Sequence, residues 1–214
     1  MTPQPITATF SIVAVDPAAG TCGAAVASKY PAVGKVVAFV RQGVGAFCTQ
    51  HYSNTPWGPA ALDLLADGNL PESVLVELLR ADPLPGKRQL ALIDMQGRVA
   101  VHNPIAADPD GCWWGALCGR FYSCQGNTLV GPQVVIAMAT AFEQTTGHLA
   151  DRLVAALLAG DQAGGDHRGR LAAGLRVAGP GLRPSPAELD VDAHADAVAE
   201  LGRLYAIRRS ELLV

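Results

Sequence analysis

The sequence predicts an α+β fold, a four-layer α/β/β/α sandwich in which two antiparallel sheets face each other and helix pairs lie outside them. Segments of strand and helical character follow one another in the order strands, two helices, strands, two helices, strand and tail helix. The turns between successive strands are short, which favours antiparallel pairing. The strands also show little polar alternation, as expected for strands covered on both faces.

Composition narrows the class of protein further. The 214 residues suffice for one large domain with a substantial core, and half of them are hydrophobic, which excludes a disordered chain. The formal net charge is −3 and there is no basic patch, so we expect no nucleic-acid partner. No apolar run reaches the roughly 18 residues of a membrane-spanning helix, so we expect no membrane partner.

Two further features predict a cytoplasmic protein. The N-terminal stretch MTPQPITATF lacks the positively charged region that opens a secretory signal. The five cysteines are an odd number and form no C-x-x-C pair, which disfavours a zinc knuckle or a thioredoxin-like motif. We therefore expect reduced thiols and a cytoplasmic location.

The first half of the chain reads as strands followed by helices. Residues 8–50 contain four strand-like stretches separated by short turns such as PAAG: TATFSIVAVD, TCGAAVASKY, VGKVVAFVRQG and VGAFCTQ. The hydrophobic periodicity then changes, because apolar residues recur at helical spacing in GPAALDLLADG and LPESVLVELLRADP. These two stretches are predicted to be helices. Pro71 fits the first turn of the second helix.

The second half repeats this order. The stretch RQLALIDMQGRVAVHN predicts a hairpin, and ALCGRFYSCQGNTLV predicts another strand region. Two consecutive helices are predicted in GPQVVIAMATAFEQTTG and HLADRLVAALLAGDQAGG, and a last strand in RLAAGLRVAG. We expect residues 1–8 to be a leader, 9–178 the main domain, 179–195 a Pro-rich linker and 196–214 a C-terminal helix.

The predicted C-terminal helix is amphipathic and has Asp196 as its expected N-cap. Val198, Leu201, Leu204 and Tyr205 fall on one of its faces. A helix that follows a flexible linker must bury such a stripe, either on its own domain or on another subunit. We expect a homo-oligomer, at least a dimer.

Most familiar catalytic motifs are missing from the sequence. It contains no G-x-G-x-x-G opening a helix, no P-loop, no H-E-x-x-H and no G-x-S-x-G. Cys48 and His51 are spaced to form a Cys–His pair, although a strand-end histidine more often serves as a hydrogen-bonding group. The run DVDAHAD, residues 190–196, would suit a metal in an extended chain, but a solvated linker is the favoured interpretation. We expect no metal and no organic cofactor.

The strongest signal for function lies at Thr9, which opens the first core strand after eight residues. The segment TFSIVAVD, with the return strand CGAAVASKY, resembles the opening of N-terminal-nucleophile (Ntn) hydrolases such as proteasome β subunits and aspartylglucosaminidases. Over residues 8–178 the chain resembles a bacterial family of uncharacterised Ntn-hydrolase-fold proteins, with matching stretches VASK, GVGAFCTQ, YSNTPWGP, QGNTLVGP and GGDHRGR.

The resemblance implies a specific chemistry. In Ntn hydrolases the residue at the head of the strand is the nucleophile, and its own α-amine, freed by cleavage, is the base. Here cleavage would follow Ala8. Where the proteasome-type site has an acidic residue at the end of the second strand, this chain has Ser28 and Lys29. We expect Lys29 to replace the lysine beside the nucleophile, because Lys35 is only a loose match.

Two strand ends supply candidate donors. Gln50 lies in CTQHYSN and Asn127 in CQGN, and each is a candidate side-chain donor to an oxyanion or a substrate carbonyl. The alternative is that both are turn residues bonded to their own backbone. Ser28 and Asn54 are candidate substrate-binding residues beside them.

The charged loop GGDHRGR, residues 164–170, is the second candidate binding element. Gly169 separates Arg168 from Arg170, so the backbone can bend and point both guanidiniums toward one carboxylate. Asp166 would orient one of them or hold a substrate amine. The alternative is a solvated loop with an exposed Asp–Arg pair.

The leading hypothesis is therefore an amidohydrolase of the Ntn type that cleaves a small amide or amino-acid-like substrate through a Thr acyl-enzyme. Two alternatives stay open. One is a non-catalytic Ntn-fold protein that binds a small ligand or a partner. The other is an assembly protein whose C-terminal helix mediates oligomerisation or wall attachment.

Overall fold

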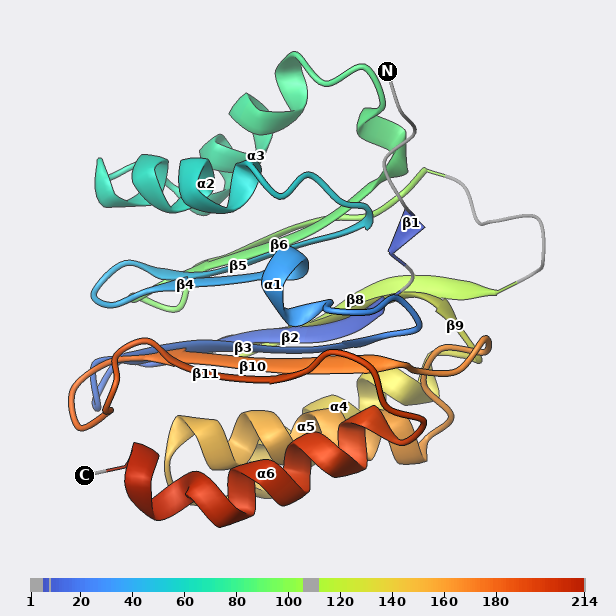
Figure 1. The fold of residues 1–214 in the computed structure, drawn as a ribbon. Coiled ribbons are helices and arrows are strands. Elements are labelled where there is room, and N and C mark those ends of the chain that lie inside the picture. The colour runs from blue at the N-terminus through green and yellow to red at the C-terminus, as the bar shows by residue number, and fades with distance from the viewer. Residues whose placement is uncertain (1–5, 8, 106–111, 214) are drawn as a thin grey trace.

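The structure, a computed structural model, describes residues 6–7, 9–105 and 112–213. These residues form two antiparallel sheets and six α-helices, so the predicted α+β class with two antiparallel sheets is confirmed (Figure 1). The predicted leader lies almost wholly outside the described residues, since only Ile6 and Thr7 of it are included.

The first sheet has six strands in the order β11-β10-β3-β2-β9-β8. Its centre is the pair β2–β3, in which Thr9 is opposite Ser28, and β2 also pairs with β9, with Phe10 opposite Gly126. The strands are β2 (Thr9–Asp16), β3 (Thr21–Ser28), β8 (Trp113–Gly119), β9 (Tyr122–Leu129), β10 (Ala172–Ala178) and β11 (Ala187–Val191). The two central strands are buried almost throughout, as expected for strands without polar alternation.

The second sheet has the strand order β1-β5-β6-β7, and β4 also pairs with β5. The predicted hairpin is present as β6 and β7. The strands are β1 (Ile6–Thr7), β4 (Ala38–Arg41), β5 (Gly45–Tyr52), β6 (Arg88–Asp94) and β7 (Val99–His102). A short helix α1 (Gly34–Val37) joins β3 to β4, and a 3-10 turn η1 (Pro85–Lys87) precedes β6.

Helices lie on the outer side of each sheet (Figure 1). The predicted pair α2 (Trp57–Ala66) and α3 (Pro71–Arg80) packs on the five-stranded sheet through Leu62, Leu65 and Val74. The second predicted pair, α4 (Gln133–Gln144) and α5 (Leu149–Gln162), packs on the six-stranded sheet. The sheets meet each other through small side chains such as Ala24, Ala46 and Ala91, so their strands can approach closely.

The chain after β10 departs from the sequence prediction. The segment expected as a Pro-rich linker contains β11, whose Ala187, Leu189 and Val191 alternate inward with exposed or half-buried residues. This period-two pattern makes the segment an edge strand on β10. Asp196 stands at the N-cap of α6 (Ala197–Leu212), but its side chain makes no capping hydrogen bond.

Helix α6 docks on its own chain. Val198, Leu201 and Tyr205 belong to the core beneath the six-stranded sheet, and the Tyr205 hydroxyl donates to Asp151 of α5 at 2.8 Å. The same carboxylate accepts from Arg209 at 2.6 and 2.8 Å. The apolar stripe that predicted an oligomer is therefore buried within the chain.

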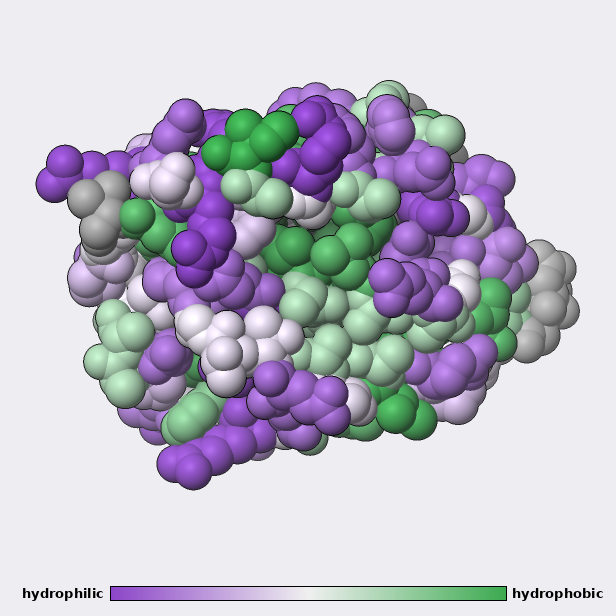
Figure 2. Space-filling model, turned by 90° about the horizontal axis from the view of Figure 1, so that it is seen from below, coloured by the Kyte–Doolittle hydropathy of each residue, from purple (hydrophilic) through white to green (hydrophobic). Residues whose placement is uncertain are grey.

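The outer face of α4, α5 and α6 still carries apolar side chains in its middle, surrounded by hydrophilic ones (Figure 2). Ile136 of α4 and Ile207 of α6 are among the exposed large hydrophobic residues. The oligomeric state stays a prediction. Within the described part of the chain, every helix is too short or too polar to cross a membrane.

Candidate functional site

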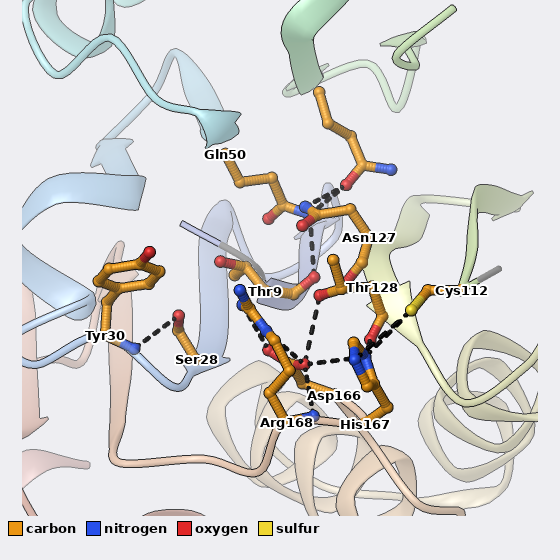
Figure 3. Close-up of polar contacts among 11 residues, drawn as sticks. Thr9, Ser28, Tyr30, Gln50, Cys112, Asn127, Thr128, Asp166, His167 and Arg168 are labelled. Carbon is orange, nitrogen blue, oxygen red and sulfur yellow. Dashed lines mark hydrogen bonds and ion pairs between the residues drawn. The ribbon is translucent and has the colours of Figure 1, made fainter. Parts of the chain in front are cut away.

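Thr9 lies at the beginning of β2, fully buried, between two neighbouring strands of the six-stranded sheet. Ser28 of β3 is opposite Thr9, and on the other side Asn127 follows Gly126, which is opposite Phe10. The five-stranded sheet contributes Gln50, whose Nε2 atom lies 3.5 Å from the carbonyl oxygen of Thr9 (Figure 3). Two residues that the sequence proposed as donors thus meet at the proposed nucleophile.

A third amide, Gln89 of β6, joins them. Its Oε1 atom accepts a hydrogen bond from Nε2 of Gln50 at 2.7 Å and another from Nδ2 of Asn127 at 2.9 Å. We call Gln50, Gln89 and Asn127 the amide cluster; all three are buried. It links the two sheets directly beside Thr9.

Backbone carbonyls fix the orientation of the amide cluster. Nε2 of Gln89 donates to the carbonyl oxygens of Gly126 at 2.8 Å and Gly115 at 3.2 Å, which can only accept. The Oε1 atom of Gln89 must therefore point the other way, toward Gln50 and Asn127. Both of those side chains must in turn present their nitrogens to it, so the assignment of oxygen and nitrogen follows from the network.

This orientation leaves one acceptor unused. Oδ1 of Asn127 is buried and has no hydrogen-bond partner among the residues that the structure describes. A buried acceptor without a partner costs about 1–3 kcal/mol, so such an atom calls for an explanation. Oδ1 of Asn127 is suited to accept a hydrogen bond from a donor that is not among the described residues.

A second chain of hydrogen bonds holds Gln50 from the opposite end. Ser11 donates to Oε1 of Gln50 at 2.7 Å and accepts from Nε2 of Gln125 at 2.6 Å. Ser123 donates to Oε1 of Gln125 at 2.9 Å, and the thiol of Cys118 lies 3.5 Å from Ser123. Each residue in this chain accepts a hydrogen bond from the residue before it and donates one to the next, ending at Gln50. The Gln50 amide must therefore present its oxygen to Ser11.

The backbone is unusual immediately after both donors. His51 has φ +65° and Thr128 has φ +53°, directly after Gln50 and Asn127 respectively. Positive φ is rare outside glycine, and for a β-branched residue such as Thr it is a genuine outlier. Conformations of this kind persist where the surrounding structure enforces them, and they cluster at functional sites.

The loop at 164–170 closes the site from the helix side. Its Asp166 is buried, accepts from Thr128 Oγ1 at 3.2 Å and pairs with Nε and Nη2 of Arg168 at 3.2 and 3.1 Å. Burial raises the pKa of the Asp166 carboxyl, and its bonds to Arg168 oppose that shift. Asp166 binds Nε and Nη2, and Nη1 of Arg168 has no hydrogen-bond partner among the described residues.

Arg168 faces the centre of the site. Its side chain is 26% exposed, and its guanidinium carbon lies 5.9 Å from the ring centre of Tyr30. Leu171 donates to the Ser28 carbonyl at 2.8 Å, which holds the end of the loop against β3. In Figure 3 the guanidinium of Arg168 lies between Asp166 and Thr9.

Arg170 does not point the same way, so that expectation is corrected. Its guanidinium pairs with Asp161 at 2.9 Å and with Asp196 at 3.2 Å. These carboxylates belong to the end of α5 and the N-cap of α6. Gly169 does bend the chain, with φ +91°, but it turns Arg170 toward those acids and away from Arg168.

The remaining candidates lie around the edge. The Ser28 hydroxyl accepts from the backbone of Tyr30 at 3.1 Å. Lys29 follows in the bend after β3 and is exposed, and Lys35 forms an ion pair with Asp192. Asn54 is half-buried at the turn before α2, where its backbone N–H donates to Thr49 at 3.0 Å. The roles of Ser28, Lys29 and Asn54 stay predictions.

The two weaker sequence hypotheses find no support. Nδ1 of His51 lies 2.8 Å from the carbonyl oxygen of Lys87, while Cys48 is buried in the core between the sheets. In the run 190–196, Asp190 pairs with Arg176 and Asp192 with Lys35, so the acids already have cationic partners. No group of His, Cys, Asp and Glu suited to a metal occurs among the described residues.

Sequence reasoning missed Gln89, Ser11 and Gln125. A signal was present in each case, because a polar side chain stands within a strand whose residues are all buried except Asp16 at the end of β2. A buried polar side chain requires a partner. The partner of Gln89 is distant in sequence, however, so the sequence alone could not name it.

The chain is similar to a known protein family and to a solved structure. Residues 9–201 match the model of a family described as a family of unknown function, DUF1028. A crystal structure of protein SPO2555 from Silicibacter pomeroyi, of the same family, is similar to this chain with a TM-score of 0.83 and 30% sequence identity. The similarity covers 94% of this chain and 89% of that one. The curated proteins contain no match.

Proposed function

The chain belongs to the DUF1028 family, whose function is unknown, and from that premise we propose that it is an amidohydrolase of the Ntn type with Thr9 as the nucleophile. The observation that carries the proposal is the convergence of Gln50, Asn127 and Arg168 on the first residue of β2 (Figure 3). The proposal includes the finer fold assignment, an Ntn-type four-layer sandwich. The positions of the helices outside two facing sheets support that assignment.

Thr9 has the surroundings that a strand-end nucleophile requires. A Thr hydroxyl is a weak nucleophile at neutral pH and needs a base beside it. Cleavage of the bond before Thr9 would supply that base as the α-amine, whose ordinary pKa is about 8. That bond involves Ala8, which lies outside the described residues.

Arg168 supplies the positive charge that we expected from Lys29. A cation beside the α-amine disfavours a second positive charge, and therefore favours the neutral amine that can accept a proton from the Thr9 hydroxyl. The salt bridge to the buried Asp166 holds the guanidinium in place. The exposed side chain of Lys29 is less suited to this role.

The amide cluster supplies donors for the oxyanion. The Thr9 hydroxyl attacks the substrate carbonyl, and negative charge develops on its oxygen. Gln50 and Asn127 each carry two N–H donors on the nitrogen, and Gln89 accepts from one of each. The second N–H of Gln50 is directed at the Thr9 carbonyl oxygen over a long 3.5 Å contact, which a substrate oxyanion would replace. The second N–H of each is aimed by the network before substrate arrives, and one preorganised donor is worth about 3–4 kcal/mol to such a transition state.

The unused Oδ1 of Asn127 fits this scheme. A cleaved Thr9 would carry an amino group, and an amide substrate carries an N–H. Either donor would satisfy the buried acceptor, which lacks a partner in the described part of the uncleaved chain.

The substrate that suits this site has an anionic end. Asp166 uses Nε and Nη2 of Arg168, so Nη1 would bind the carboxylate, and the guanidinium carbon lies 5.9 Å from the ring centre of Tyr30. We therefore propose a small amide with a carboxylate group, which is the amino-acid-like class expected from the loop sequence.

Intact-mass spectrometry of the purified full chain tests the proposal. We expect loss of residues 1–8 in the wild type, full mass in Thr9→Ala, and hydrolysis of N-acyl amino acids and dipeptides only by the cleaved form. Thr9→Ser should retain both properties. Thr21→Ala is the matched control, because Thr21 is a buried Thr on the neighbouring strand but lies opposite Asp16, at the far end of β2.

A ligand-binding protein is the second candidate. The pairing of β1 with β5, where Thr7 is opposite His51, favours it, because it ties the segment before Thr9 to the sheet. An uncleaved wild type that binds N-acyl amino acids through Arg168 without hydrolysing them would decide for this alternative.

A further inference from the structure

Cys112 and His167 form a thiol–imidazole pair that the proposed hydrolase does not use. Cys112 lies just before β8, and His167 belongs to the loop between Asp166 and Arg168 (Figure 3). The sulfur lies 3.2 Å from Nδ1 and 3.6 Å from Nε2 of the imidazole. The sulfur is nearer to Nδ1, so a proton transfer to Nε2 requires the two side chains to move until the thiol meets the lone pair of Nε2.

The backbone selects the tautomer of His167. Nδ1 lies 3.0 Å from the carbonyl oxygen of Thr128, and a carbonyl oxygen can only accept. Nδ1 therefore carries the proton, and Nε2 keeps the lone pair that can take the proton of the Cys112 thiol. The backbone N–H of His167 donates to the same carbonyl at 3.1 Å, so the residue is held at two points.

A carboxylate and a guanidinium lie beside the imidazole. Oδ1 of Asp166 lies 3.7 Å from Nδ1. Arg168 pairs with the same carboxylate. The imidazole is 34% exposed, so a reagent can approach it from solvent.

The other four cysteines provide a contrast within the same chain. Cys22, Cys48 and Cys124 are buried, and burial raises the pKa of Cys22 to about 11 and that of Cys48 to about 12. Cys118 is exposed, and its thiol lies 3.5 Å from a hydroxyl, that of Ser123, rather than beside a base. Cys112 combines partial exposure with an imidazole.

We propose that Cys112 and His167 form a nucleophilic pair at the edge of the Thr9 site, a position for covalent modification by small soft electrophiles such as low-molecular-weight disulfides. His167 Nε2 takes the thiol proton, and the thiolate attacks one sulfur of the disulfide. A new S–S bond forms to Cys112 as the old one breaks, and the leaving thiolate takes the proton back from the imidazolium. The products are a mixed disulfide and one thiol, so no further oxidant is needed.

Modification would act on the neighbouring site through the loop. His167 lies between Asp166 and Arg168, and it binds the carbonyl of Thr128, the residue after Asn127. A group attached to Cys112 would therefore crowd the loop that positions Arg168. The pair itself does not depend on Thr9, so the proposal stands or falls separately from the proposed hydrolase.

The experiment is limited alkylation of the native full chain with iodoacetamide at pH 7, with each cysteine followed by peptide mass spectrometry. Alkylation forms an S–C bond and releases iodide and the thiol proton. A free thiol is only a few per cent thiolate at this pH. Proton transfer to His167 raises the thiolate fraction of Cys112, and the lower nucleophilicity of a stabilised thiolate partly offsets the gain in rate. We expect Cys112 to react about threefold or more faster than the better exposed Cys118.

His167→Gln separates activation from exposure. The ratio of the Cys112 rate to the Cys118 rate should fall to about one or below, while Cys22, Cys48 and Cys124 stay unmodified and report an intact fold. If this variant exposes the buried cysteines, His167→Asn replaces it. A wild-type ratio of one or below overturns the proposal without any variant, and so does a ratio that a folded variant leaves unchanged.

Discussion

Oε1 of Gln89 lies 2.9 Å from Nδ2 of Asn127, and this hydrogen bond joins a strand of one sheet to a strand of the other beside Thr9. Gln89→Leu would remove the acceptor that Gln50 and Asn127 share and the donor to the carbonyl oxygens of Gly115 and Gly126. We expect a loss of about 2–4 kcal/mol in the free energy of unfolding, measured with urea. Gln144→Leu, at an exposed position ending α4, should change it by less than about 0.5 kcal/mol. Equal losses in the two variants would contradict a structural role for the cluster.

Arg168 and Arg170 form a matched pair for testing carboxylate recognition. Arg168→Lys should weaken binding of an N-acetyl amino acid by about tenfold, because lysine keeps the charge but cannot bind Asp166 and a ligand with one rigid fork. Arg170→Lys should bind it like the wild type, since that side chain contacts Asp161 and Asp196. Titration calorimetry with the acid and its amide analogue measures the difference. If both variants lose the same affinity for acid and amide, Arg168 does not read the carboxylate.

The Asp82–Arg88 ion pair predicts a pH dependence of stability. The two side chains are only 2% and 6% exposed, and Nε of Arg88 lies 2.6 Å from Oδ2 of Asp82. The hydrogen bond from Arg88 lowers the pKa of Asp82. The folded protein therefore holds this proton less tightly than the unfolded chain, so the pair contributes fully above the unfolded pKa of about 3.9 and less as the pH falls below it.

The corresponding variant is Asp82→Asn. It removes the carboxylate that pairs with the buried Arg88 guanidinium, and we expect a loss of about 3–5 kcal/mol in the free energy of unfolding at pH 7. The difference from the wild type should shrink as the pH falls below about 4. Urea unfolding across this range, with the exposed Asp67→Asn as control, provides the measurement. A difference that stays constant with pH would mean that the charge of Asp82 does not matter.

Gly174 and Gly202 should respond to alanine with opposite signs. A Cβ atom at Gly174 would meet the Cα atom of Gly34 at 2.5 Å, where α1 packs on β10. Overpacking against backbone costs about 1–3 kcal/mol. A Cβ at Gly202 meets only the end of Leu158 at 3.4 Å, so alanine in the middle of α6 should stabilise by about 0.5–1 kcal/mol. Thermal unfolding of both variants tests this, and a stable Gly174→Ala would show that α1 can move away.

The secondary structure was largely predictable because it depends on local patterns. The helical spacing of Leu62 and Leu65 predicts α2, and the two apolar runs that flank the turn DMQG predict β6 and β7. Both patterns lie within a few residues of the chain. The strand β11 was not predicted, because the prolines before it indicate a linker. The burial of the apolar face of α6 on its own chain was not predicted either, because its partner α5 lies far away in the sequence.

The candidate site was predictable only in part for the same reason. Thr9, Gln50 and Asn127 could be found as polar residues at strand ends, and the fold does bring them together. The direction of Arg170 depends on Asp161 in α5 and on Asp196 at the N-cap of α6. No local pattern reveals such a contact. The sequence therefore placed Arg170 in the loop but could not predict the direction of its side chain.

The docking of α6 determines how this protein can be handled as a recombinant fragment. Ending the chain at residue 178 would remove β11 and α6 together. It would leave β10 as an unprotected edge and the apolar surface of α5 open to water. Such a fragment should aggregate rather than fold. Because Leu213 also pairs with Leu182, even an affinity tag should be kept away from the C-terminus by a spacer.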